Sequence, residues 1–250
     1  MRAIVATVFD HVTLRVSDID RSTRHYTTLL DTLGVAPLEG APRLPEWEND
    51  LSLAQADAEH PATRNLHLAF FAPTEDEVRT FWRTGLDAGL DDDGEPGPRA
   101  EYGPDYFGGF LRDPDGNSVE AVLLGRDRRR GQIDHLWIRV ADVAAARDFY
   151  AAIAPYAGIR LDHDTPERAQ FRFPDGSFSL VAGTPTEHVH LAFGTDDDGA
   201  VTSFHATATA LGHADNGAPG ERPEYHPGYF AAFVLDPDGN NVELVNHHRR

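Results

Sequence analysis

The sequence predicts an α+β protein made of two similar domains. Each domain is expected to contain a pair of strand–helix–strand–strand–strand units, whose mostly antiparallel strands curl around a pocket. Two observations predict this class. Most of the chain occurs twice in the same order, and within each copy short alternating apolar stretches are interleaved with longer helical ones.

The internal repeat defines the expected domain boundaries. Phe9–Leu30 is similar to Ile133–Ala154, which begins 124 residues later. From His67 onward the two copies lie 123 residues apart. The segment between the copies, GRDRRRGQ, is charged and has little to bury, which is typical of a linker. We therefore expect a first domain over residues 1–124, a linker over 125–132 and a second domain over 133–250.

Each copy begins with a strand and a helix. Polar and apolar residues alternate in His11–Val16, as in a strand with one buried face. Ser17, followed three residues later by Asp20, predicts a helix start, and Gly34 predicts its end. The matching helix of the second copy is expected over Asp142–Gly158.

Short strands and a second helix follow. We expect strands at Leu51–Gln55 and Asn65–Phe70, which are short and rich in apolar residues. Thr74 with Glu77 predicts the start of a helix that ends at Gly89, and its counterpart is expected over Thr195–Gly212. The acidic segment Asp91–Glu95 is expected to be a solvated loop.

Each copy ends in a predicted hairpin with one acidic residue in its returning strand. Glu101–Val122 and Glu224–Val245 share the turn Asp-Pro-Asp-Gly-Asn between two apolar runs. The acids are Glu120 and Glu243. A carboxylate on such a strand costs several kcal/mol unless it is paired or bound to a metal.

Composition excludes several kinds of site and partner. The chain of 250 residues has no cysteine and no lysine, which excludes disulfides, thiolate chemistry and Schiff bases. A net charge of −19 argues against nucleic-acid binding. No apolar run approaches the roughly 18 to 20 residues of a membrane helix, and the N-terminus does not resemble a signal peptide. We expect a cytoplasmic protein.

Both copies carry the same three candidate metal ligands. Each histidine lies in a short apolar strand, on the face opposite the core residues, so that a curled sheet would direct all three polar groups into one cavity. Two His and one carboxylate suit Fe(II) best, and also Mn, Zn or Ni. The candidates are His11, His67 and Glu120 in the first copy, and His135, His190 and Glu243 in the second.

With these ligands and hairpins, nearly the whole chain resembles the vicinal oxygen chelate superfamily. That superfamily contains glyoxalases, extradiol dioxygenases, fosfomycin resistance transferases and bleomycin resistance proteins. The resemblance implies two tandem domains, each a pair of βαβββ modules with a divalent metal. It also implies that modules can be exchanged between domains. His11 would then complete the site of His190 and Glu243 instead of that of His67 and Glu120, and the sequence leaves both arrangements open.

The surroundings of Glu243 resemble those of the extradiol ring-cleaving dioxygenases. Their signature has a His, an apolar-Tyr pair, an Asp-Pro-x-Gly turn and then the metal-ligating Glu. His226 stands at the position of the signature's His, which implies an acid–base role, because a histidine titrates near neutral pH. Phe233 replaces the Tyr, and Tyr229 or Tyr225 would supply the missing hydroxyl.

Other residues complete the expected site. The first copy has Gly103 where the second has His226, so chemistry is expected in the second copy. Trp137 and Arg139 share the strand face of a candidate ligand and would bind substrate. Glyoxalase-type sites use a second acid on an earlier strand, where this chain has only Ser52 and Ser179.

The sequence and this resemblance therefore predict a divalent-metal-dependent enzyme that acts on a small metal-chelating molecule. It is expected to be most like an extradiol dioxygenase, an oxidoreductase, with iron as the favoured metal. Two alternatives are a glyoxalase-like isomerase or lyase, and a bleomycin-resistance-type drug-binding protein without catalysis. We expect no membrane partner, and either a monomer or a homodimer.

Overall fold

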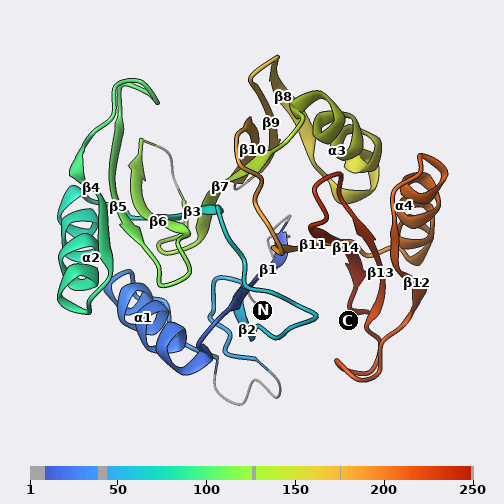
Figure 1. Cartoon of the computed structure of the whole chain (residues 1–250), viewed down its shortest axis with the longest axis horizontal. Helices are drawn as coiled ribbons and strands as arrows, with labels where there is room; N and C mark the ends of the chain where they lie inside the picture. Colours follow the sequence, from blue (N-terminus) through green and yellow to red (C-terminus); the bar gives the residue numbers. More distant parts are fainter. Residues whose placement is uncertain (1–8, 39–43, 126–127, 175, 249–250) are drawn as a thin grey trace. The chain divides into compact units, whose positions relative to one another are not determined.

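The protein divides into two compact units, each of the expected α+β class (Figure 1). The computed structural model describes residues 9–38, 44–125, 128–174 and 176–248. Unit 1 contains Met1–Val12 and Arg139–Arg250, and unit 2 contains Thr13–Ile138. Strands β1 (Phe9–Val16) and β7 (Ile133–Val140) therefore pass from one unit into the other. Within the described ranges, no helix is long and apolar enough to cross a bilayer.

Unit 2 is built around strand β3. This strand pairs in parallel with β6 and antiparallel with β7, and the strand order is β4-β5-β6-β3-β7. Strand β2 is hydrogen-bonded to β1, and helices α1 and α2 contact each other. The elements that lie wholly in this unit are α1 (Ile19–Thr32), β2 (Leu51–Gln55), β3 (His67–Phe71), α2 (Glu75–Asp87), β4 (Asp91–Pro98), β5 (Tyr106–Arg112) and β6 (Ser118–Leu124).

Unit 1 repeats this plan around strand β11. The order is β12-β13-β14-β11-β1, with β11 parallel to β14, and a second group of strands runs β10-β9-β8. Helices α3 and α4 contact each other. The elements that lie wholly in this unit are α3 (Val143–Ala157), β8 (Arg160–Thr165), β9 (Arg168–Phe173), β10 (Gly176–Ala182), β11 (His190–Gly194), α4 (Asp198–Ala210), β12 (Asp215–Glu221), β13 (Phe230–Leu235) and β14 (Asn241–Asn246).

Two of the predicted helix starts are confirmed and two are wrong by one or two residues. Thr74 and Asp142 cap α2 and α3, because their side chains accept backbone N–H groups of the first turn. Helix α1 is capped by Asp18 instead of Ser17, whose hydroxyl donates to Asp115. Helix α4 is likewise capped by an aspartate, Asp197, and not by the threonine two residues earlier. A carboxylate also interacts favourably with the helix dipole.

The expectation of a solvated loop at Asp91–Glu95 is wrong. These residues begin β4, which pairs antiparallel with β5 at the edge of the unit 2 strands. An edge strand with exposed side chains needs only backbone pairing, so apolar alternation does not reveal it. The strand register shifts around Gly94 and Gly97, and Gly94 has a φ of 149°.

The hairpin turns are tied to the first helix of each unit. Asp113 begins one turn, accepts two backbone N–H groups of that turn and accepts the hydroxyl of Tyr26 on α1. Asp236 is held in the same way by Tyr150 on α3. Burial raises the pKa of Asp236 to about 6. These bonds fix the strands that return from the turns, β6 and β14, against the helices.

Candidate metal centre

Three side chains of ligand type converge on neighbouring strands of unit 2. Ala69 of β3 lies opposite Glu120 of β6 on one side and opposite His135 of β7 on the other. His67 precedes Ala69 by two residues and therefore points to the same face. Oε2 of Glu120 lies 3.0 Å from Nε2 of His67 and 3.5 Å from Nε2 of His135. The register in which these strands pair thus brings together a group of side chains that could hold a metal ion.

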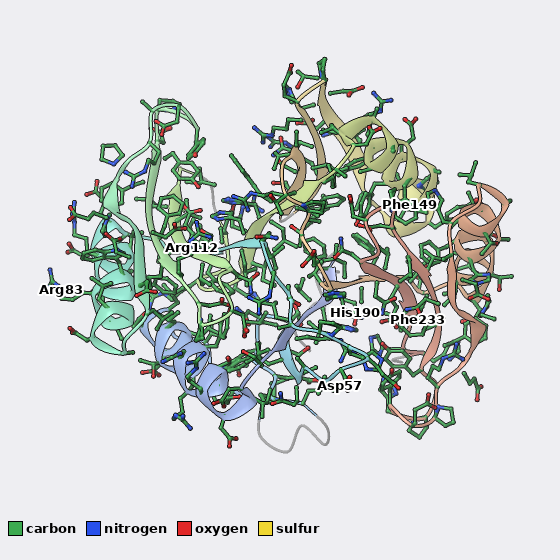
Figure 2. All side chains as sticks on the ribbon, in the orientation of Figure 1. Asp57, Arg83, Arg112, Phe149, His190 and Phe233 are labelled. Carbon is green, nitrogen blue, oxygen red and sulfur yellow. The ribbon has the colours of Figure 1, made fainter. Side chains whose placement is uncertain are left out.

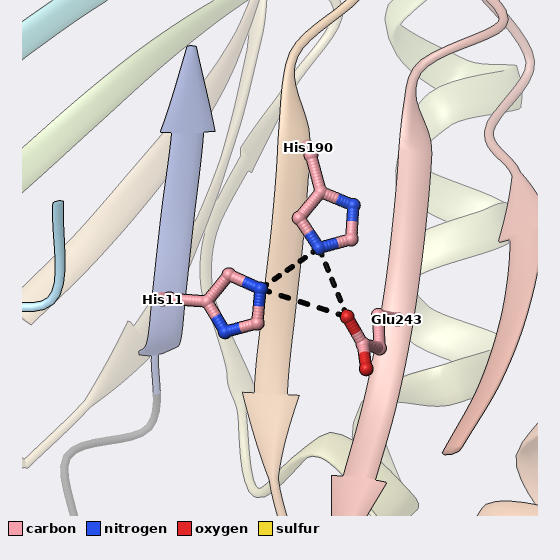
Figure 3. A group of neighbouring side chains, drawn as sticks. All are labelled: His11, His190 and Glu243. Atoms are coloured by element: carbon pink, nitrogen blue, oxygen red, sulfur yellow. Dashed lines mark hydrogen bonds and ion pairs between the residues drawn. The ribbon is translucent and has the colours of Figure 1, made fainter. Parts of the chain in front are cut away.

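Unit 1 contains an equivalent group on β1, β11 and β14 (Figure 3). Nε2 of His190 lies 2.9 Å from Oε2 of Glu243 and 3.0 Å from Nε2 of His11. The His11–Glu243 distance is 3.6 Å between Nε2 and Oε2. The ring of Phe233 lies 6.2 Å from that of His190, and both residues are labelled in Figure 2.

Each triad combines residues from both sequence repeats. His11 of the first repeat lies with His190 and Glu243 of the second, and His135 of the second repeat lies with His67 and Glu120 of the first. Of the two arrangements that the sequence leaves open, the structure therefore has the exchanged one.

Hydrogen bonding around His67 shows that a lone pair faces the centre of the unit 2 triad. The Ser118 hydroxyl donates its single hydrogen to Asp93 at 2.7 Å, so Ser118 can only accept from Nδ1 of His67, 3.1 Å away. Nε2 of His67 is consequently unprotonated in a neutral ring. It faces a carboxylate oxygen of Glu120, another acceptor, and two facing acceptors require a cation or a proton between them.

The histidine on the first strand of each triad is held by the aspartate that precedes it. Asp10 accepts Nδ1–H of His11 and Asp134 accepts Nδ1–H of His135, both at 2.9 Å. Although burial opposes ionisation, hydrogen bonds from His11 and His247 lower the pKa of Asp10 below its usual range. An ionised aspartate can only accept, so Nε2 of the histidine is left free to bind a metal.

The donor sets therefore fit a divalent ion. In unit 2, two imidazole nitrogens and one carboxylate oxygen, which are atom types that divalent metals bind, converge on one another. Two imidazoles and one carboxylate are ligands that Fe(II), Mn, Zn and Ni accept, and three ligands leave positions open for a substrate.

A known family model matches the first part of the chain. Residues 8–121 match the family model described as Glyoxalase/Bleomycin resistance protein/Dioxygenase superfamily. Residues 8–121 belong to this superfamily. Among curated proteins, none matches the sequence significantly.

Solved structures of superfamily proteins share the fold over almost the whole chain. Glyoxalase I from Zea mays is 22% identical, with a TM-score of 0.68 over 96% of this chain and 92% of that chain. A protein from Bacillus subtilis assigned as a dioxygenase is 13% identical, with a TM-score of 0.63 over 96% of this chain and 85% of that chain. At these identities the likeness shows the fold alone.

A tyrosine holds the carboxylate in each triad. Tyr106 donates to both oxygens of Glu120, at 2.7 and 2.9 Å, and Tyr229 donates to Oε1 of Glu243 at 2.6 Å. Burial raises the pKa of Glu120 to about 7, although the hydrogen bond from Tyr106 acts in the opposite direction. The free oxygen of Glu243 remains directed at the two histidines.

Metal affinity in unit 2 is expected to rise with pH. The metal-free protein retains the proton of Glu120 up to about pH 7, and a metal ion must displace it. Below pH 7 this group alone weakens binding about tenfold for each pH unit, and above pH 7 its effect ends. Competition titrations on a Glu243→Gln protein, which retains only the unit 2 triad, measure this dependence. A pH-independent affinity between about pH 5.5 and 8 would contradict it.

Loss of the Tyr229 hydroxyl is expected to weaken the unit 1 site. Tyr229→Phe removes the bond that orients Glu243, and an orienting partner of this kind contributes roughly tenfold to metal affinity. The matched control is Tyr156→Phe, which loses a hydroxyl bonded to Thr207 on a helix of the same unit. Equal metal affinities of the two variants would argue against this orienting role.

The other residues predicted for the site do not all lie in one unit. His226 and Tyr225 both lie near Tyr229 in unit 1, with ring centroids 5.2 and 4.9 Å from its ring. Trp137 lies beside the unit 2 triad, 5.9 Å from the ring of His67. Arg139 belongs to unit 1, where its side chain lies beside Gly183. Trp137 and Arg139 thus lie in different units, and their roles in substrate binding stay predictions.

Several residues around the triads were not predicted from the sequence. The aspartates before His11 and His135 could have been identified from the sequence, because the dipeptide Asp-His occurs in both repeats. Tyr106 could also have been identified, because it stands at the position of Tyr229 in the first repeat. His247, which bonds to Asp10 at 2.8 Å, could not have been identified in this way, because it follows the part of the repeat in which the two copies are similar.

Proposed function

We propose that the protein is a divalent-metal enzyme of the extradiol dioxygenase kind, which acts on a small molecule that chelates the metal through two neighbouring oxygens. The observation that carries this proposal is the convergence of two His and one Glu in each unit. Such a set would hold a metal through three residues and would leave positions on it for a bidentate substrate and O₂.

The absence of a fourth acid favours three-ligand chemistry over glyoxalase-type chemistry. In the described part of the chain, each metal-type group contains three residues. Ser52 is bonded to Thr13 at 2.7 Å, and Ser179 accepts from Arg168 at 3.1 Å. Neither serine therefore takes the place of a fourth ligand.

The unit 1 triad is proposed as the reactive one. His226 and Tyr229 lie together there, and Tyr229 contacts Glu243 directly. At the position of His226, unit 2 has Gly103, which offers no acid or base. Within unit 1, this chain's residues bind and orient the substrate and move its protons.

A bound metal would supply Lewis-acid polarisation of the substrate oxygens, and Fe(II), the favoured ion, would also supply a site for O₂. The protein contributes the remaining features. The tyrosine hydroxyls orient the carboxylates, the aspartates orient the histidines, and the aromatic ring of Phe233 borders the unit 1 group. These contacts support a flat, oxygen-rich substrate such as a catechol.

Oxygen uptake by Fe(II)-loaded protein on a panel of catechols tests the proposal. The protein is loaded without oxygen, and uptake is recorded with ring-cleavage absorbance. We expect turnover by the wild type and by Glu120→Gln, which spares the unit 1 triad, and none by Glu243→Gln. Tight Zn or Ni binding without oxygen uptake would favour isomerase or lyase chemistry instead. Ligand binding that needs no metal would favour a drug-binding protein.

A further inference from the structure

An arginine of unit 1 lies over an aromatic ring beside the triad. Cζ of Arg222 is 5.6 Å from the centroid of the Phe233 ring. Phe233 lies directly opposite Glu243 in the pairing of β13 with β14, and its ring centroid is 6.2 Å from that of His190. Side chains of directly opposite residues share one face of a sheet. A single aromatic ring therefore separates the guanidinium of Arg222 from the triad.

Unit 2 has the same arrangement around Arg99. Cζ of Arg99 is 5.3 Å from the centroid of the Phe110 ring. Phe110 lies opposite Glu120, and its ring centroid is 6.0 Å from that of His67. Although burial raises the pKa of Glu120, the positive charge of Arg99 acts in the opposite direction, so this charge reaches the triad. The two arginines occupy corresponding positions of the sequence repeats, and each places a cation beside a candidate metal site.

Backbone carbonyls of an edge strand hold each guanidinium in place. Arg222 donates to the carbonyls of Ala218 and Glu221 on β12, at 2.6 and 3.2 Å. Arg99 makes the corresponding two bonds to β4, at 2.7 and 3.2 Å. A guanidinium has five N–H groups, so three remain available in each unit. These bonds fix the position of the cation without neutralising its charge.

Neither arginine forms an ion pair within the part of the chain that the structure describes, although the chain has 41 acidic residues. Other arginines of both units do form such pairs. Arg112 of unit 2 lies 2.8 Å from Asp93, and Arg147 of unit 1 lies 2.8 Å from Asp148. A carboxylate can bind a guanidinium through two parallel charge-assisted hydrogen bonds. The arginines beside the triads keep this capacity for a ligand.

Glycines leave room for each arginine and its aromatic ring. A Cβ atom at Gly220 would lie 3.0 Å from Nη1 of the arginine in unit 1, and one at Gly217 would lie 2.8 Å from the aromatic ring. In unit 2 the corresponding distances, from Gly97 and Gly94, are both 3.1 Å. Side chains at these positions would press against the cation or against the ring beneath it. Both units thus have a cradle that accepts the arginine.

The turn that follows each arginine ends in an exposed tyrosine. The backbone N–H of Tyr225 donates to the carbonyl of Arg222 at 3.0 Å. Tyr225 is 45% exposed, and its ring lies 4.9 Å from that of Tyr229, which donates to the glutamate of the triad. In unit 2, Tyr102 is 47% exposed and its ring lies 5.1 Å from that of Tyr106. Contacts thus run from the arginine through the phenylalanine, the triad and two tyrosines back to the same turn.

We propose that the substrate of the unit 1 site is a dihydroxylated aromatic carboxylate, in which Arg222 binds the carboxylate and Tyr225 contacts the ring. This inference rests on the proposed function, which places two neighbouring oxygens of the substrate on the metal. The net charge of −19 disfavours the approach of an anion, so its binding needs a local cation that no acid neutralises. Arg222 is a recognition residue and moves no proton, because a guanidinium stays charged. In unit 2, Arg99 and Tyr102 recognise the same class of molecule.

Equilibrium binding to the Zn(II)-loaded full chain tests this inference without turnover. The probes are 3,4-dihydroxybenzoate and its methyl ester, which has the same ring and hydroxyls but no charge. Both bind to the Glu120→Gln protein, in which only the unit 1 triad is intact. We expect the acid to bind at least about tenfold more tightly than the ester, and salt to weaken this preference. Equal affinities for acid and ester would overturn the inference.

Substitution of Arg222 tests whether this residue causes the preference. Arg222→Gln keeps a donor for the carbonyls of β12 but removes the charge, so the ratio of acid to ester affinity should fall about tenfold or more. Arg222→Lys keeps the charge without the paired N–H groups and should give an intermediate ratio. The matched control, Arg147→Gln, removes an arginine that is paired with Asp148 and should keep the ratio of the parent protein. A ratio as high as that of the parent in both Arg222 variants would show that this arginine only supports the edge strand.

The same two probes given to the Fe(II)-loaded protein with oxygen separate this inference from the proposed function. Preferential binding of the acid without oxygen uptake on any catechol would contradict the proposed function and leave the carboxylate site standing. Oxygen uptake with equal kcat/KM for acid and ester would support the proposed function and overturn the inference.

Discussion

Glu243→Gln is expected to reduce bound divalent metal from two ions per chain to one. The amide keeps the size of the side chain and can still accept from Tyr229, but it removes the only anionic ligand of the unit 1 triad. Neutral ligands alone compensate the charge of a buried cation poorly, and affinity at this site should fall by at least about a hundredfold.

Metal content after dialysis and calorimetric titration both measure this effect. The matched control is Glu221→Gln, which changes an exposed acid on β12 of the same unit and should leave two ions bound. Two ions retained at unchanged affinity by Glu243→Gln would show that the convergence of His11, His190 and Glu243 is a packing feature and not a metal site.

Phe178→Ala is expected to lower the free energy of unfolding of unit 1 by about 4 kcal/mol. Phe178 is fully buried in β10, and its ring stacks on Phe171 at 5.2 Å and meets Tyr150 edge-on at 5.0 Å. It also lies 6.2 Å from Phe9 and 6.3 Å from Phe193. The truncation leaves a cavity among rings that come from three strands and a helix, so little of it can close.

Denaturant unfolding measures this loss. Leu211→Ala is the control, because that side chain is 60% exposed after α4 and its truncation should cost less than about 0.5 kcal/mol. A loss below about 1 kcal/mol for Phe178→Ala would mean that the aromatic cluster of unit 1 repacks around the cavity.

Local patterns in the sequence were enough to predict the main elements and the six candidate ligands. Strand alternation places His11 and His67 opposite apolar neighbours such as Val12 and Leu68, which are buried as expected. The Asp-Gly turns predict the hairpins that carry Glu120 and Glu243. These features depend on residues that are close in sequence. Because the sequence is repeated, each feature could be recognised in two copies.

Features that depend on residues far apart in sequence were not predictable in the same way. Pairing of β3 with β7 decides that His135 joins His67, and no local pattern specifies that partner. The contact between His247 and Asp10 joins residues 237 positions apart. Strand β4 was missed for another reason, since an exposed edge strand is specified by backbone pairing and leaves no apolar periodicity.

The exchange of first-strand histidines between repeats is tested most directly by metal stoichiometry in two double variants. His11→Ala with Glu243→Ala damages a single triad if the exchange is correct, so this protein should keep one ion per chain. His11→Ala with Glu120→Ala damages both triads and should bind none. The reverse result, with no ion bound by the first protein and one by the second, would contradict the exchanged arrangement and the account of both sites.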